Sequence, residues 1–148
     1  MSGTLLHTPA NILRWLLISL AQGTDPDADE DWPIYVSREP NAPDSVITIY
    51  NTTAVKQGRL MISGEVAERP GVQIRVRDSD EKSGFVKANA IAIALDGVTY
   101  GGVTLDGTAY KVYAVSRTSG PLSIGKEDSP TKRNIFTLNV TAALRQAD

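Results

Sequence analysis

The sequence has no cysteine among its 148 residues. Disulfide bonds, a thiolate metal site and a cysteine nucleophile are therefore excluded. Positive charge is not in excess either, because 15 Lys and Arg stand against 17 Asp and Glu, giving a formal net charge of -2. Proteins that grip nucleic acid usually carry surplus cations that displace counterions from phosphate. The composition gives no sign of that role.

Motifs that carry catalysis are also missing. Neither a glycine-rich phosphate loop nor Gly-x-Ser-x-Gly occurs. The single histidine, His7, has no acidic or hydroxyl partner in a recognisable motif and is expected to be an exposed linker residue. The carboxylate pairs at 80–81 and 127–128 each lie beside lysine in a polar stretch, where the shifted pKa of a catalytic acid is rare. We therefore expect a binding or structural protein, not an enzyme.

The apolar stretch 15–21 is far shorter than the roughly 20 residues that span a bilayer. Its flanks favour a capped helix over a signal peptide, with Thr8 as N-cap, Pro9 at the first helical position and Gly23 just past the end. We expect neither secretion nor a membrane partner. The residues expected to share the apolar face of this helix are Ile12, Leu13, Leu16, Leu17 and Leu20.

The most regular pattern in the chain is a strand followed by a long helix. Val72, Ile74 and Val76 alternate with polar residues, which is the period of a half-buried strand. Residues 79–81 offer acceptors and negative charge for a helix N-terminus, and Gly97 marks the end. The stripe expected to face the core comprises Phe85, Ala88, Ile91, Ala92 and Leu95.

The opposite side of this helix is apolar as well. Val86, Ala90 and Ile93 repeat at spacings of four and three residues, and Lys87 is the main charge between residues 85 and 95. A helix that is apolar all round is normally buried all round. In a chain this short, either another helix or another subunit is expected to cover the second face.

Further strands are predicted at 34–37, 46–50, 110–115 and 133–142. Gly101-Gly102 and Asp106-Gly107 are expected to form tight turns, and residues 116–132 a polar loop. In the last strand, the side chains expected to face the core are Phe136, Leu138 and Val140, and those expected to face out are Thr137, Asn139 and Thr141.

Two segments carry weaker patterns. Residues 25–31 are acidic but lack the glycine and glutamate spacing of a calcium loop, so a solvated turn without metal is expected. Residues 51–69 form either a protruding arm or hairpin or an ordinary surface loop with a short strand. The whole predicts one domain over residues 1–148 with an α+β fold: a mixed, mainly antiparallel sheet of about six strands packed by an N-terminal helix and a central helix.

The order of these elements resembles the tail terminator (tail-completion) proteins of long, non-contractile-tailed bacteriophages, including those called minor capsid proteins. The resemblance begins with the leading helix, residues 70–77 and the alanine-rich helix behind them. It continues with residues 110–112, Pro121 with Ile124-Gly125, and a closing segment at 133–140. It covers most of the chain, and its motifs are packing patterns rather than catalytic signatures.

The resemblance implies a virion protein that acts at the head–tail junction after assembly in the host cytoplasm. There it forms a homo-oligomeric ring, with six members expected, that caps the head-proximal end of the tail tube and stops tube polymerisation. Its partners are then the tail tube protein and a head-completion or neck protein, with DNA passing through the channel unbound. No cofactor is expected. Alternatives are another neck or head-completion protein, the tube subunit itself, a small enzyme, or a monomeric ligand-binding domain.

In such a ring we expect the second face of the central helix to lie at a subunit contact. The full set of interface candidates is Trp15, Ile18, Val86, Ala90, Ile93, Arg75 and Arg77. The two arginines, together with Arg117, are expected to meet acidic residues of neighbouring subunits instead of pointing bare into the channel. The alternative is that they are plain solvated surface.

Overall fold

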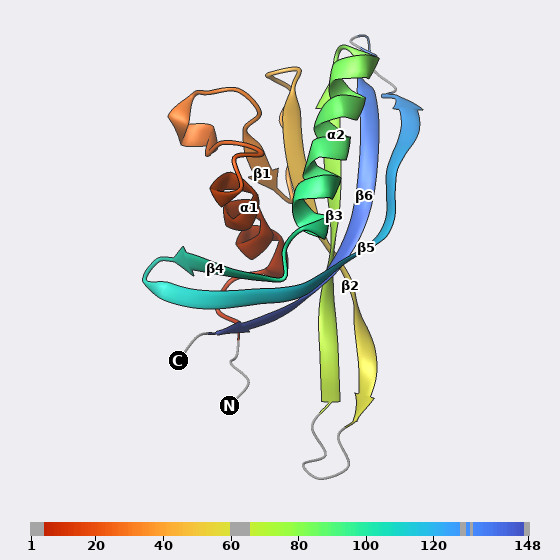
Figure 1. The fold of residues 1–148 in the computed structure, drawn as a ribbon. Helices are drawn as coiled ribbons and strands as arrows, with labels where there is room; N and C mark the ends of the chain where they lie inside the picture. The colour runs from red at the N-terminus through yellow and green to blue at the C-terminus, as the bar shows by residue number, and fades with distance from the viewer. Residues whose placement is uncertain (1–4, 60–65, 128–129, 131, 147–148) are drawn as a thin grey trace.

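A six-stranded sheet with two helices on one face forms the body of the protein in a computed structural model (Figure 1). The structure describes residues 5–59, 66–127, 130 and 132–146, without the side chains of 53–59 and 66–68. The strand order is β1-β2-β3-β6-β5-β4. Only β1 (Ile34–Val36) runs parallel to its neighbour β2 (Val46–Arg59), and the other pairs are antiparallel. The predicted α+β fold is confirmed.

Helix α1 (Pro9–Ser19) begins as predicted, because the Thr8 side chain accepts a hydrogen bond from the Asn11 amide and Pro9 occupies the first position. Ile12, Leu13, Leu16 and Leu17 are buried in the core. The helix ends earlier than predicted: Leu20 is its C-cap, four residues after Leu16, and Gly23 lies beyond it. A 3-10 turn, η1 (Pro26–Ala28), follows within the acidic segment.

Strand β3 (Val66–Asp78) lies in the interior of the sheet, between β2 and β6 (Asn134–Gln146). Ile74 pairs with Ile49 on one side and Leu138 on the other, and all three side chains are fully buried beneath the helices. The alternation of β3 therefore builds the core face. The expectation that Phe136, Leu138 and Val140 face this core is confirmed.

Helix α2 (Glu81–Asp96) follows β3 after a two-residue turn. Asp80 caps its N-terminus by accepting hydrogen bonds from the Ser83 amide and hydroxyl, and Gly97 is its C-cap. Ala88, Ile91, Ala92 and Leu95 are buried as predicted. The prediction for Phe85 is wrong, because its side chain is 48% exposed and reaches the core only at its edge, against Phe136. Gly84 takes the buried place beside it.

Strands β4 (Tyr100–Leu105) and β5 (Thr108–Lys126) correct two predictions. Gly101-Gly102 is strand, and the tight turn falls at Asp106-Gly107 alone, where both residues have positive φ. Residues 116–126 are not a loop. They continue β5 along β6 with four shifts of register. One of these bulges turns Ala114 to solvent, so that it does not share the buried face of Tyr110.

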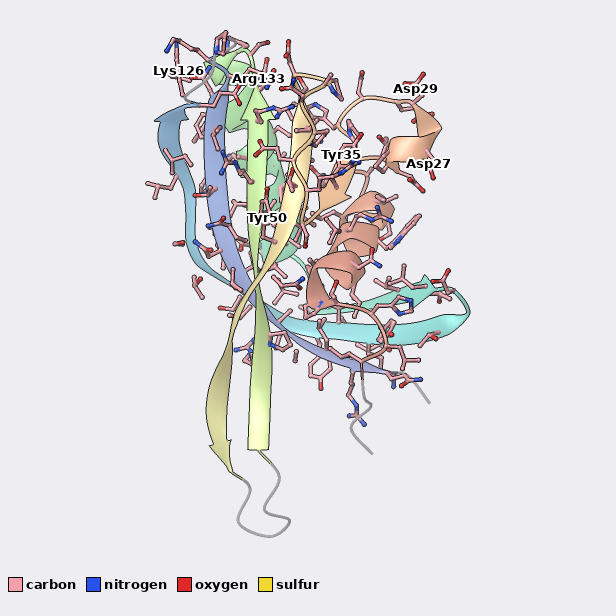
Figure 2. All side chains as sticks on the ribbon, turned by 180° about the vertical axis from the view of Figure 1, so that it is seen from behind. Asp27, Asp29, Tyr35, Tyr50, Lys126 and Arg133 are labelled. Carbon is pink, nitrogen blue, oxygen red and sulfur yellow. The ribbon has the colours of Figure 1, made fainter. Side chains whose placement is uncertain are left out.

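The face of the sheet opposite the helices is partly covered. Thr137 and Thr141 of β6, expected to face out, are 7% and 9% exposed. Thr137 lies between Arg75 of β3 and Leu122 of β5 in the register, so long neighbouring side chains shield it. Figure 2 views the molecule from the side opposite to Figure 1 and so shows this face, with β2 and β3 crossing in front.

Candidate assembly surfaces

Within the part of the chain that the structure describes, the outer face of α2 is left uncovered. Val86 is 57% exposed and Ile93 is 63% exposed, whereas Ala90 is half-buried. Together with the loop before β1, this face lines an open groove of about 560 Å³. We call it the α2 groove, and the residues that line it are Trp32, Lys82, Ser83, Val86, Lys87 and Ala90.

Lys87 helps to hold the two walls of the α2 groove together. Its ammonium lies 5.5 Å from the centre of the Trp32 ring, within the range of a cation–π contact. Burial lowers the pKa of Lys87. Lys87 is the charged residue that interrupts the second apolar face in the sequence, and here its stem and ring contact extend the apolar wall.

Trp15 and Ile18 on α1 lie elsewhere. Both are partly buried and pack against the core of their own subunit, and neither lines the α2 groove. The guanidinium of Arg14 lies 5.1 Å from the centre of a Trp15 ring. The structure therefore brings Val86 and Ala90 together as one surface but does not join the α1 candidates to it.

Arg75 and Arg77 lie on the face of the sheet away from the helices and meet a carboxylate of their own chain. Glu39 is 3.0 Å from Arg75 Nε and 3.5 Å from Arg77 Nη1. Arg77 is 2% exposed and also donates to the carbonyls of Pro43 and Asp44. Burial, with the nearby positive charge of Arg133, lowers the pKa of Arg77.

These contacts tie the segment between β1 and β2 to the sheet. Arg133 adds to them by donating to the Asn41 carbonyl and pairing with Asp44 and Glu127. The hydrogen bond to Glu127 raises the pKa of Arg133. Arg117 likewise meets Asp96 of its own chain at 3.0 Å. We predicted that acidic residues of neighbouring subunits contact Arg75, Arg77 and Arg117, and this stays a prediction.

His7 is the clearest departure from the sequence interpretation. Instead of an exposed linker residue, it is a half-buried link between distant parts of the chain. Its Nδ1 lies 2.7 Å from the Tyr110 hydroxyl, and its Nε2 lies 3.3 Å from Asp106. Tyr110 also accepts from the Leu6 amide at 3.1 Å. Asp106 is almost fully exposed, so this cluster is not an enclosed site. Its contacts hold the N-terminal segment against β5.

A second apolar surface lies at the far end of β5. Leu122 is 58% exposed and Ile124 is 51% exposed. Lys126, two residues after Ile124 on β5, is also exposed. So is Lys132, which precedes Arg133, the residue whose carbonyl accepts from the Glu127 amide. We call Leu122, Ile124, Lys126 and Lys132 the β5 tip. Sequence reasoning missed this surface because glycine, proline and serine made the segment read as a loop.

Two kinds of site are absent from the part of the chain that the structure describes. No group of three or more His, Asp or Glu side chains there is placed to hold a metal ion. No helix among those residues is long and apolar enough to cross a membrane. Two exposed apolar surfaces, the outer face of α2 and the β5 tip, remain to be explained.

Exposed apolar surfaces on a well-packed scaffold are typical of subunits that assemble with other proteins. A family model described as bacteriophage tail terminator protein matches residues 16–145. The chain belongs to this family, which gives it a structural role among the proteins of a phage tail and a place in the virion. A search of curated proteins finds no match.

Proposed function

We propose that this protein forms a ring that caps the head-proximal end of the tail tube, stops tube polymerisation and provides the joining surface for the head or neck. The observation that carries the proposal is the outer face of α2, where Val86 and Ile93 are more than half exposed in a member of the tail terminator family. A six-membered ring buries that face in each copy against a neighbour.

A ring of this size leaves room for DNA. A folded domain of this length has a radius of gyration of roughly 15 Å, which for a compact sphere means a radius of about 19 Å. Six touching spheres of that radius enclose an opening of about 38 Å, which admits a duplex. Six copies at -2 each carry -12 in total, so the ring as a whole does not attract phosphate.

The hairpin of β2 and β3 is the proposed arm that reaches a neighbour or the tube. The two strands pair from Val46 and Arg77 out to Arg59 and Val66, and Figure 1 shows them running well past the body of the domain. Residues 60–65 of the expected arm lie outside the described residues. A long paired extension that leaves the core suits a contact made only on assembly.

The experiment measures tube growth. The purified protein is added to polymerising tail tube protein, and tube lengths are counted by electron microscopy beside a native mass measurement of the protein alone. A terminator ends growth at substoichiometric amounts and itself gives a ring mass. A protein that is built into the tube along its whole length is a tube subunit, and a protein without effect on growth contradicts the terminator role.

A further inference from the structure

We propose that the β5 tip of one copy docks into the α2 groove of the next copy, with its lysines facing the acidic segment at residues 25–31. This inference rests on the proposed ring and names the two surfaces that join its subunits. The occupant of the α2 groove is then a second copy of this chain. The contact is head to tail, because the two surfaces are different parts of the molecule.

The apolar parts of the two surfaces match in kind. The α2 groove offers Val86 and Ala90 beside the Trp32 ring, and the β5 tip offers the exposed side chains of Leu122 and Ile124. Each of these apolar surfaces stays in contact with water in a free subunit. Placing one on the other removes both from water at once, which is the main driving force of association.

The charged parts of the two surfaces are opposite in sign. The acidic segment adjoins the α2 groove through Trp32, and its exposed carboxylates are Asp27, Asp29, Glu30 and Asp31. Among the described residues, no ion pair includes any of these four or the lysines of the β5 tip. Lys126 and Lys132 can therefore form ion pairs with the acidic segment of a neighbouring copy.

The placement of the two surfaces suits a closed ring. Figure 2 shows Lys126 on one side of the molecule and Asp27 and Asp29 on the other, near the same end of the sheet. Copies turned about an axis parallel to the strands bring one side of a subunit against the opposite side of the next at the same level. Contacts between two different surfaces propagate in this way, and a rotation that closes gives a ring.

The absence of native cysteine allows a direct test. Ala90→Cys and Ile124→Cys are made together and separately, and each protein is treated with a short bismaleimide. We expect the double variant to give a ladder of covalent dimers, trimers and higher species, while each single variant stays monomeric. Dimers of a single variant mean that a surface meets its own copy and overturn the inference. A double variant without a ladder overturns it too.

Charge exchange supplies the second arm. Lys126→Glu with Lys132→Glu makes the tip acidic. Replacing the four exposed carboxylates Asp27, Asp29, Glu30 and Asp31 by lysine makes the acidic segment basic, because only Asp25 of its acidic residues remains. We expect each of these two charge variants alone to assemble about tenfold more weakly per contact. Mixed in equal amounts they restore rings, because alternating copies make every contact complementary. Rings of either variant that match wild type, or a mixture that does not recover, count against the proposed contact.

Native mass spectrometry of wild type, alone and with tail tube protein, separates the two levels of failure. A wild-type ring with unaffected variants leaves the proposed function standing and removes this contact. A wild type that stays monomeric under both conditions removes the ring and the contact together.

Discussion

Replacing Ile93 by glutamate is the sharpest test of the α2 face. In the free subunit this side chain is 63% exposed, on the far side of the helix from the buried Ile91 and Leu95. Glutamate forms helix at least as well as isoleucine, so we expect the free energy of unfolding to change by no more than about 0.5 kcal/mol.

Assembly is expected to suffer much more than folding. Fully burying an isoleucine contributes about 1.5–3 kcal/mol, so the exposed 63% of Ile93 stands for about 1–2 kcal/mol per contact. Leaving a carboxylate without a partner in the contact adds at least about 1 kcal/mol more. The sum of about 2–3 kcal/mol corresponds to a contact roughly 30- to 150-fold weaker.

The assay compares ring formation by native mass spectrometry with thermal unfolding of the same sample. Thr104→Glu is the matched control, because Thr104 is an exposed residue of β4 and receives the same charge away from α2. Leu95→Glu, at a position 1% exposed, marks what unfolding looks like. If Ile93→Glu unfolds the subunit as Leu95→Glu does, or assembles as well as Thr104→Glu, the reasoning about this face is refuted.

Four further outcomes are expected. Ile74→Asp leaves an unpaired charge in the fully buried centre of β3, which costs several kcal/mol against a typical stability of about 5–15 kcal/mol, and we expect no cooperative thermal transition. A soluble, cooperatively folding variant contradicts the core assignment. Tyr110→Phe removes the hydroxyl that meets Leu6 and His7, and we expect a loss of about 1 kcal/mol in urea unfolding with no change in the dependence on denaturant. An unchanged midpoint shows that the anchor contributes nothing. Hydrogen bonds to the first turn of α2 hold the pKa of Asp80 below its ordinary 3.8, so its stabilisation is present above that value and is lost as pH falls through the lower folded pKa. The gap in Tm between wild type and Asp80→Ala is therefore expected to close in acid, and a gap that widens there reverses the sign of the argument. Finally, duplex DNA titrated at low salt is expected to bind weakly, because the chain has no surplus of cations. Tight, steeply salt-dependent binding favours a DNA-gripping neck protein.

The elements that the sequence predicted well are those whose pattern is set by one buried face. Val72, Ile74 and Val76 face the helices while their neighbours do not, so the alternation survives in the structure. The N-caps of both helices were predicted for a related reason. The Thr8 side chain accepts from the Asn11 amide, three residues further along the chain. Contacts between residues this close in sequence can be predicted from a short sequence motif.

The part of β5 beyond residue 115 was not predicted, because this segment is held as a strand by hydrogen bonds to a distant part of the chain. Bulges insert extra residues and break the two-residue period that identifies a strand. Gly120, Pro121 and Gly125 then give the segment the composition of a loop. Its hydrogen-bonded neighbour is β6, and no local pattern records that pairing. The β5 tip was hidden by the same cause.

Gly101 shows how packing between distant elements overrides a local signal. Gly-Gly is typical of a turn, but here it lies within β4, where α1 crosses the strand. A Cβ atom built on Gly101 lies 3.1 Å from the Leu16 side chain, so the missing side chain allows close approach of the helix. His7 is a similar case, since its partners lie 99 and 103 residues away in the chain.

The composition of α2 gives the strongest physical reason to expect assembly. One apolar stripe of the helix is fully buried against the sheet, where Ala88 and Ile91 are 0% exposed. The subunit gains little from Val86 and Ile93, which remain mostly in water, and a polar side chain at either position keeps the helix equally well. A free monomer therefore has no folding reason for a second apolar stripe. A contact with another subunit supplies a reason, because it removes this stripe from water. The sequence pattern alone already led us to expect that another helix or another subunit covers the stripe.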